Sequence, residues 1–137
     1  MRTERDAEDP AQTRPYYRLL GLRVEPGTGA GRSRVCIDSR PELENSRGDF
    51  HGGVVASMLD AAMGVAVRSA YPGGEGATTV SLTVHYLEPG RGSLVATGNV
   101  RRAGGSLASA EAEVVDASGR VVAHAVGTMR ILRAASR

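Results

Sequence analysis

Asn45-Ser46-Arg47-Gly48-Asp49-Phe50-His51-Gly52-Gly53 is the stretch that decides the fold, because it joins a polar loop to a long apolar run. Residues 52–70 predict the one long helix of the chain. The first N–H groups of a helix are unpaired and its dipole is positive there, so this start attracts negative charge. Asp60 lies about two turns further along. A lone acid near such a helix start indicates hydrolysis of an activated acyl group, with the acid and the N–H groups converging on one reactive carbon.

The predicted helix has two faces of different character. One face carries an apolar stripe at helical spacing: Val55, Met58, Leu59, Ala62, Ala66 and Ser69. The opposite face carries mostly small residues: Gly53, Ala56, Ser57, Asp60, Gly64 and Val67. A face in contact with solvent would carry Lys and Glu instead, so we expect a ligand or a second subunit to cover it. Asp60 is then an acid on a partly buried face, where a carboxylate needs a partner.

Strand patterns occupy most of the remaining chain. Short strands are predicted at residues 22–25 and 32–38, after a short helix that Thr13 can cap and Gly21 can end. Four longer strands are predicted at residues 77–87, 93–102, 106–116 and 120–132, separated by short turns that contain Gly. The short connections predict an antiparallel meander in which each strand pairs with the next. The last strand is largely apolar on both faces, and one helix cannot cover both, so we expect a homo-oligomer.

Length and composition limit the functions that are open to the chain. Its 137 residues fit one domain, placed at residues 15–133 between a charged leader of disordered composition (1–14) and a short tail (134–137). The net charge is +2, with no basic helix face, one Phe and no Trp, so no nucleic-acid partner is expected. No run is apolar enough to span a membrane. The single cysteine excludes an internal disulfide and fits a reducing cytoplasm.

The cysteine and the histidines do not form a site of their own. Cys36 alternates with apolar neighbours, which favours a small buried residue over a nucleophile. His85 and His124 lie in predicted strands without a cluster of Cys or acidic residues, so no metal site is expected. His51 precedes the helix and is interpreted as a loop residue that forms hydrogen bonds, not as the base.

One helix wrapped by a mostly antiparallel sheet of five to six strands is an α+β arrangement that matches the hotdog fold. The chain resembles the PaaI-like acyl-CoA thioesterases of this fold from about Tyr16 to Leu132. The resemblance lies in Asn45, five residues and then His51-Gly52-Gly53; Asp60 nine positions after His51; Thr79 within Thr78-Thr79-Val80-Ser81-Leu82; Tyr86-Leu87-Glu88-Pro89; and Arg102-Ala103-Gly104-Gly105-Ser106-Leu107-Ala108.

This resemblance implies roles for the matched residues. Asp60 would activate water as a general base or attack the thioester directly, in either case across a subunit interface. The Gly52 N–H would hold the developing oxyanion, and Gly53 would leave room for the substrate. Thr79 would orient water or the acid from the partner subunit. His51 would mainly have a positioning role.

Two matched positions have alternative interpretations. Asn45 is either a turn residue, the usual role of Asn in loops, or an amide close to the thioester and the attacking water. The turn that contains Arg102, Gly104, Gly105 and Ser106 is either an ordinary hairpin or the place where the nucleotide end of coenzyme A binds, as in the resembling proteins. The family often has another Arg or Lys where Gly105 stands here.

The sequence therefore predicts an enzyme that hydrolyses an acyl-CoA thioester to a carboxylate and free CoA, without a separate cofactor. A thiol has a pKa of roughly 8.5, so its thiolate leaves with little help, and one acid, one oxyanion donor and one hydroxyl suffice. One alternative is a noncatalytic acyl-CoA-binding or regulatory domain. The other is an acyl-CoA dehydratase, whose chemistry usually pairs a histidine with an acid. The resemblance also implies a dimer or a dimer of dimers.

Overall fold

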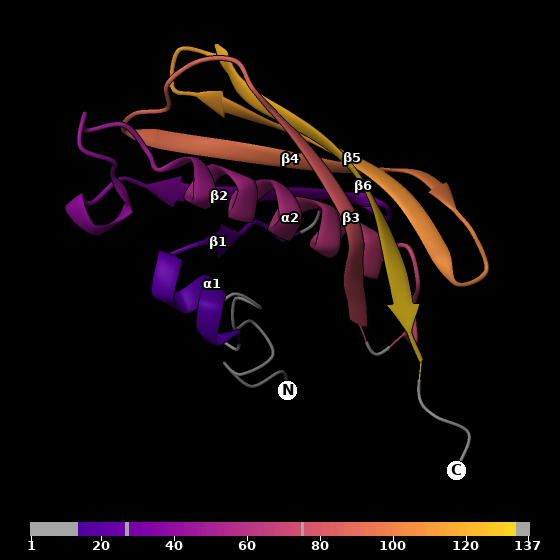
Figure 1. The fold of residues 1–137 in the computed structure, drawn as a ribbon. Helices are drawn as coiled ribbons and strands as arrows, with labels where there is room; N and C mark the ends of the chain where they lie inside the picture. The colour runs from indigo at the N-terminus through magenta and orange to yellow at the C-terminus, as the bar shows by residue number, and fades with distance from the viewer. Residues whose placement is uncertain (1–13, 27, 75, 134–137) are drawn as a thin grey trace.

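The computed structural model describes residues 14–26, 28–74 and 76–133, which form one long helix and a six-stranded sheet (Figure 1). Residues 1–13 and 134–137 lie outside the described part, and with them lie the predicted tail, nearly all of the predicted leader and the capping residue Thr13. The elements are α1 (Pro15–Leu20), β1 (Arg23–Val24), β2 (Arg32–Asp38), the 3-10 helix η3 (Pro41–Leu43), α2 (Gly52–Ser69), β3 (Gly76–Tyr86), β4 (Ser93–Ala103), β5 (Leu107–Asp116) and β6 (Val121–Leu132).

The predicted bounds agree closely with these elements. Each strand and the long helix begin and end within one residue of the predicted ranges. α1 ends at Gly21, which adopts φ 76° and donates its N–H to the Arg18 carbonyl, a left-handed conformation that glycine reaches without strain. Neither described helix combines the length and the hydropathy that crossing a membrane requires.

The sheet is antiparallel, with strand order β1-β2-β4-β5-β6-β3. The predicted meander is correct for β4, β5 and β6 but wrong for β3, which pairs with β6 instead of β4. Both sides of β4 are taken, by β2 and by β5. After β3, the Leu87 and Glu88 N–H groups still bind the Val122 carbonyl, and the chain then crosses to the end of β2, where the Ser39 N–H binds the Gly92 carbonyl. A short connection here spans the sheet instead of closing a hairpin.

α2 lies on the concave face of the curved sheet, and its apolar side packs on β2, β4 and β5 (Figure 1). The helix approaches the sheet closely at Gly98 of β4, where an added Cβ would lie 2.3 Å from the Ala62 carbonyl oxygen. The buried Ser33 hydroxyl donates to that same carbonyl (2.6 Å). A glycine and a small polar residue therefore fix the position of α2, and with it the positions of Gly52 and Asp60.

The small-residue face of α2 is only partly covered within one chain. Gly64 and Val67 are buried, whereas Ala56, Ser57 and Asp60 are partly exposed and Gly53 is exposed. The assignment of Ser69 to the apolar stripe is wrong, because Ser69 lies exposed at the end of the helix. Its hydroxyl accepts from the Gly31 N–H and donates to the Ala66 carbonyl, bonds that a buried apolar position would not offer.

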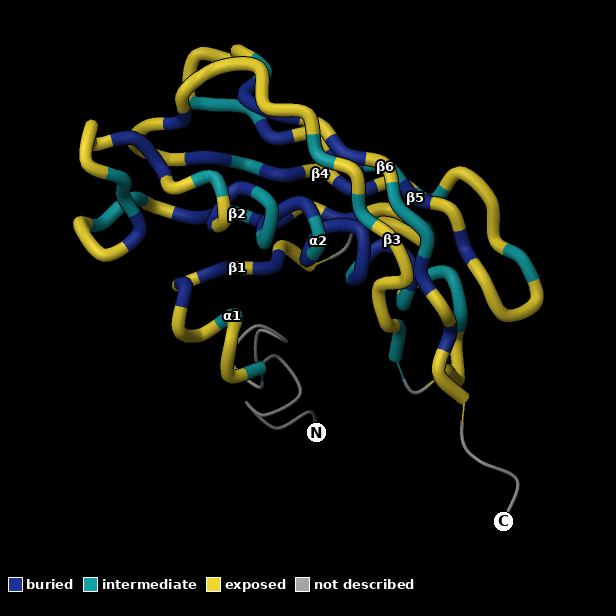
Figure 2. The backbone as a smooth tube through the Cα atoms, in the orientation of Figure 1, coloured by how far each residue is buried: buried dark blue, intermediate teal, exposed yellow. Residues whose placement is uncertain are grey.

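β3 is the long open edge of the sheet, because β6 is its one partner among the described strands. Figure 2 shows that the strand is exposed or partly exposed along its whole length. Val80 and Tyr86 are 60% and 54% exposed, although both are large apolar side chains. An exposed edge with apolar side chains is a surface on which another strand can pair.

Candidate active site

The residue before α2 holds the first turn of the helix. The His51 side chain accepts from the Gly53 N–H through Nδ1 (2.8 Å), and its carbonyl accepts from the N–H groups of Val54 (2.9 Å) and Val55 (3.2 Å). The Gly52 N–H has no acceptor among the residues that the structure describes. Gly52 therefore offers the free donor of this helix start. The cap fits the expected positioning role of His51, and it occupies the N–H of Gly53.

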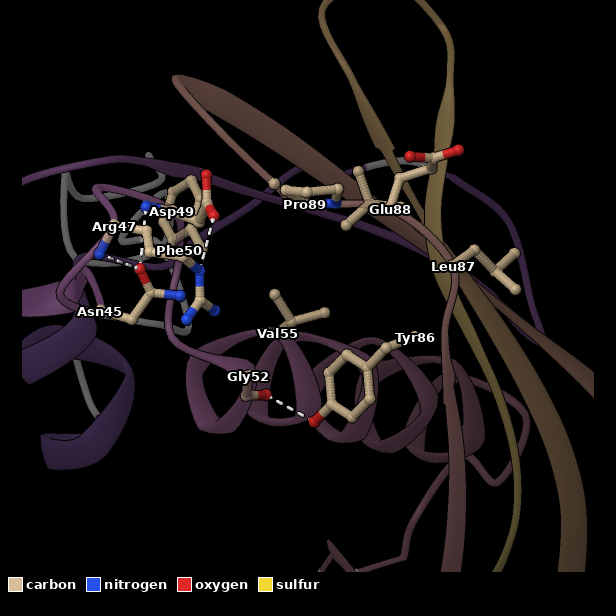
Figure 3. A pocket seen from close by; sticks show the side chains of 12 residues that line it. Asn45, Arg47, Asp49, Phe50, Gly52, Val55, Tyr86, Leu87, Glu88 and Pro89 are labelled. Carbon is tan, nitrogen blue, oxygen red and sulfur yellow. Dashed lines mark hydrogen bonds and ion pairs between the residues drawn. The ribbon is translucent and has the colours of Figure 1, made fainter.

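A cavity of about 380 Å³ opens beside Gly52 (Figure 3). The Tyr86 hydroxyl donates to the Gly52 carbonyl (2.6 Å), which ties the end of β3 to the start of α2. A Cβ at position 52 would lie 3.4 Å from the Tyr86 ring, which is an ordinary contact, so the Tyr86 ring packs directly on Gly52. The wall combines polar and apolar side chains and is lined by Asn45, Arg47, Asp49, Phe50, Gly52, Val55, Tyr86, Leu87, Glu88, Pro89, Gly90 and Val122.

Asn45 is a turn residue that also lines the cavity beside Gly52, and its role close to a thioester stays a prediction. Its Oδ1 accepts from the N–H groups of Arg47 (2.9 Å) and Asp49 (3.2 Å), which makes it a turn residue. These bonds fix the side chain, and its amide nitrogen forms no hydrogen bond with the described residues. Asn45 lines the same cavity as Gly52. Its N–H groups are therefore available as further donors on that cavity wall.

The wall beside Asn45 is charged. The Asp49 carboxylate, in a residue that is 6% exposed, binds Arg91 Nε (2.5 Å) and lies 3.7 Å from Arg47 Nε. Its bond to Arg91 raises the pKa of that guanidinium. Figure 3 shows Asn45, Arg47 and Asp49 clustered on one side of the cavity. No functional role was predicted for Arg47, Asp49, Tyr86 or Arg91, because their contacts depend on the folded loop.

Asp60 is held by a hydroxyl from the neighbouring strand. Its Oδ1 accepts from Thr79 Oγ1 of β3 (2.5 Å). Thr79 lies at a register shift in the pairing of β3 with β6, and such bulges redirect side chains. Within one chain, the hydroxyl that binds Asp60 thus comes from β3 of the same chain, and its expected contribution across a subunit interface stays a prediction. The acid is partly exposed and has a specific partner, so it differs from a polar residue that is merely tolerated on a helix surface.

One chain does not bring Asp60 and the Gly52 N–H together. Eight residues separate them along α2, which corresponds to about 12 Å of helix rise. Asp60 is absent from the lining of the cavity beside Gly52. The expected convergence on one carbon is therefore not met within a single chain.

The hairpin that contains Arg102, Gly104, Gly105 and Ser106 lies at the opposite end of α2 from Gly52 (Figure 1). The Tyr71 hydroxyl, just after α2, donates to the Gly104 carbonyl (2.6 Å), and the Ile131 N–H donates to the Ser106 carbonyl. Arg102 and Gly105 are exposed. Within one chain, the predicted CoA-binding residues therefore fall into two groups, Gly53 near the cavity and the hairpin far from it.

Other reactive side chains lie outside these places. The rings of His85 and His124 stack with centroids 5.0 Å apart on the outer side of the sheet, and both residues are exposed. In residues 14–26, 28–74 and 76–133, no group of three or more His, Cys, Asp or Glu could hold a metal ion. Partial burial and a hydrogen bond with Glu25 raise the pKa of the Cys36 thiol, which disfavours the reactive thiolate.

One helix wrapped by a six-stranded antiparallel sheet, with an acid on the helix and a free N–H at its start, defines a hotdog-fold protein with the elements of an acyl-transfer site. The chain belongs to the thioesterase superfamily, whose family model matches residues 47–123. A candidate esterase of Halobacterium salinarum is 37% identical over 93% of this chain and 96% of its own length. The medium/long-chain acyl-CoA thioesterase YigI of Salmonella typhimurium is 32% identical, over 85% of each chain.

Solved structures give the same fold. The Escherichia coli PaaI protein has a TM-score of 0.80 over 88% of this chain and 86% of its own, at 24% identity. A Bacillus halodurans protein solved with CoA has a TM-score of 0.78 over 90% of this chain and 84% of its own, at 32% identity. The predicted hotdog fold and the PaaI-like resemblance are confirmed.

Proposed function

We propose that this protein hydrolyses acyl-CoA thioesters to a carboxylate and free CoA. The relative YigI is named an acyl-CoA thioesterase, and a structural neighbour was solved with CoA. One observation carries the proposal. α2 carries both Asp60, which is held by the Thr79 hydroxyl, and Gly52, whose N–H has no acceptor among the described residues. An acid with an orienting hydroxyl and a free oxyanion donor are the groups that thioester hydrolysis requires.

The active site is assembled from two copies of the chain. About 12 Å of helix separates Asp60 from Gly52, so these residues cannot reach one carbon from the same α2. A two-fold axis that runs two α2 helices antiparallel would place Asp60 of one protomer beside the partner's Gly52 and Asn45. The open edge of β3, with Val80 60% exposed, supports such a contact. The protein is thus a homo-oligomer, a dimer or a dimer of dimers.

Hydrolysis follows from these positions in two steps. Asp60 takes a proton from water while the water oxygen forms a bond to the thioester carbon, and the negative charge that develops on the carbonyl oxygen is stabilised by the partner's Gly52 N–H and Asn45 amide. One such donor stabilises a transition state by about 3 kcal/mol. The tetrahedral species then collapses, the carbon–sulfur bond breaks, and the CoA thiolate takes up a proton. The acid product keeps the water oxygen.

The alternative role of Asp60 is that of a nucleophile, which attacks the thioester directly. In that route the carboxylate forms an anhydride, the thiolate leaves, and water then cleaves the anhydride. A single turnover in ¹⁸O-labelled water tests for the anhydride route. Attack of water on the anhydride at its aspartyl carbonyl places ¹⁸O in Asp60, which mass spectrometry of the protein detects, whereas the base route labels the product alone.

CoA binding by the Arg102 hairpin and a cytoplasmic location remain predictions. The hairpin lies far from Gly52 of its own chain (Figure 1). If it binds CoA, it therefore binds the CoA of a substrate whose thioester lies at the Gly52 of another protomer. Exchange of the exposed Arg102 for Met would raise the KM for acyl-CoA and leave kcat nearly unchanged. Cell fractionation checks the location.

The decisive experiment is thiol release from a panel of acyl-CoAs by wild type and Asp60→Asn. We expect the substitution to lower turnover by about 100-fold or more. Glu113→Gln is the matched control, because Glu113 is exposed on β5 and forms no ion pair with the described residues. Equal turnover in the wild type and the Asp60 variant would refute the role of Asp60. Tight acyl-CoA binding without thiol release in wild type would instead identify a noncatalytic binding domain.

A further inference from the structure

Arg68, in the last turn of α2, has a buried donor without an acceptor. Its Nη2 atom is buried and forms no hydrogen bond with the residues that the structure describes. No carboxylate of those residues lies within ion-pair distance of its guanidinium. An unpaired buried donor is costly, and Arg68 as a whole is only partly buried, so its guanidinium can meet an acceptor from outside the chain.

The guanidinium folds back along the helix toward Asp60. Its Nη1 atom lies 3.3 Å from the point where a Cβ of Gly64 would be, so the glycine leaves the space that the guanidinium occupies. Asp60, Gly64 and Arg68 follow one another at intervals of four residues and share one helix face.

The same place adjoins the Asp60–Thr79 pair from the side of the sheet. The Met129 methyl group lies 3.8 Å from the Gly64 Cβ point. Met129 is directly opposite Thr79 in the pairing of β3 with β6, and Thr79 donates to Asp60. Both contacts meet at the Gly64 Cβ point, so they place the guanidinium at Gly64, which lies about one helix turn (5.4 Å) beyond Asp60 on α2.

We propose that Arg68 binds a carboxylate at the far end of the acyl group, so that the substrates are CoA thioesters of short dicarboxylic acids. This inference rests on the proposed function, because it assumes that the thioester carbon lies at Asp60. Arginine binds carboxylates through two parallel N–H bonds, and Arg68 is partly exposed with no acceptor for its Nη2 among the described residues. A distance of about one helix turn from Asp60 suits an acyl group of roughly four to six carbons. A plain alkyl chain would cover the guanidinium without giving it an acceptor.

The test compares two pairs of substrates that differ only in the terminal carboxylate: butanoyl-CoA with succinyl-CoA, and hexanoyl-CoA with adipoyl-CoA. We expect wild type to have a kcat/KM at least about 10-fold higher for one or both carboxylated substrates. Arg68→Met removes the charge and keeps the length of the side chain. It should lower kcat/KM for the preferred carboxylated substrate by about 10- to 100-fold, the range of a hydrogen bond to a charged group. The plain partner of that substrate should change by less than about 3-fold.

Two further variants keep the result interpretable. Arg130→Met is the control for loss of a positive charge, because Arg130 is exposed on β6, and it should change none of the four values. Gly64→Ala retains Arg68 but places a methyl group 3.3 Å from Nη1, so it should reduce the same preference even if Arg68→Met does not fold.

The inference is wrong if wild type shows no preference for a carboxylated substrate, or if Arg68→Met lowers all four values equally. It is also wrong if Arg68→Met dissociates the oligomer in sedimentation, because the acceptor would then belong to a second copy of the chain. Failure of the proposed function is distinguishable from these outcomes. In that case wild type releases no thiol from any acyl-CoA, while calorimetric binding of the four compounds still measures whether Arg68 selects the carboxylate.

Discussion

Gly98→Ala tests whether the close contact of α2 with the sheet positions the active site. The new Cβ would lie 2.3 Å from the Ala62 carbonyl oxygen and 2.5 Å from Ser33 Oγ. Ordinary contacts of a Cβ are 3.4–4 Å, so either α2 or β4 must move by about 1 Å. The Ser33–Ala62 hydrogen bond, which is buried, would be strained or broken by that movement.

The structure gives the magnitude of this effect. Overpacking costs about 1–3 kcal/mol, and loss of a buried hydrogen bond costs about 1–3 kcal/mol more. A total of about 2–6 kcal/mol corresponds, for a domain of this length, to a fall in Tm of at least roughly 6 °C. Circular dichroism during a thermal scan measures this fall.

Gly105→Ala is the matched control. Nothing lies within 4 Å of its Cβ point, and its φ is not positive, so Tm should stay within about 1 °C of wild type. Because α2 carries both Gly52 and Asp60, Gly98→Ala should also lower kcat in the fraction that remains folded. If Gly98→Ala has the same Tm as the control, the close approach of α2 at Gly98 does not position the helix, and the reasoning is refuted.

Two further predictions concern the catalytic groups. Thr79→Val removes the hydroxyl bound to Asp60 and keeps the shape of the side chain. Turnover in the thiol-release assay should fall about 10- to 100-fold, and Thr83→Val on the same strand should leave it unchanged; equal effects of both would contradict a specific role. A mixture of Asp60→Asn and Asn45→Ala chains, unfolded and refolded together, should regain about a quarter of wild-type turnover, because each hybrid dimer contains one intact composite site. No gain over the separately refolded variants would show that each site lies within one chain.

Local patterns predict the elements of this fold but not their order in the sheet. Alternation and turn residues place the strands to within one residue, and helical spacing does the same for α2. The partner of β3 is decided by bonds such as those from Leu87 and Glu88 to Val122, which is more than 30 residues away in the sequence. The short connection between β3 and β4 does not reveal that β2 already occupies the position next to β4.

The candidate site follows the same division. The helix pattern indicates Asp60 and the helix start at Gly52, the family resemblance adds Asn45 and Thr79, and the structure pairs Asp60 with Thr79. Tyr86 lies in a matched motif but had no predicted role, and Arg91 had none either, since they reach Gly52 and Asp49 from 34 and 42 residues away. Arg68 has no local signal either, because its significance lies in a buried donor that only packing reveals.

The His51 carbonyl, which accepts from both Val54 and Val55, has a consequence for the Gly52 N–H. The two groups belong to a single amide, so electron density drawn toward that oxygen is withdrawn from the nitrogen at the other end. Each such bond strengthens the next in a chain by about 10–30%. The helix thus makes its exposed amide proton more acidic before any thioester arrives, and this activation requires no movement when the substrate binds.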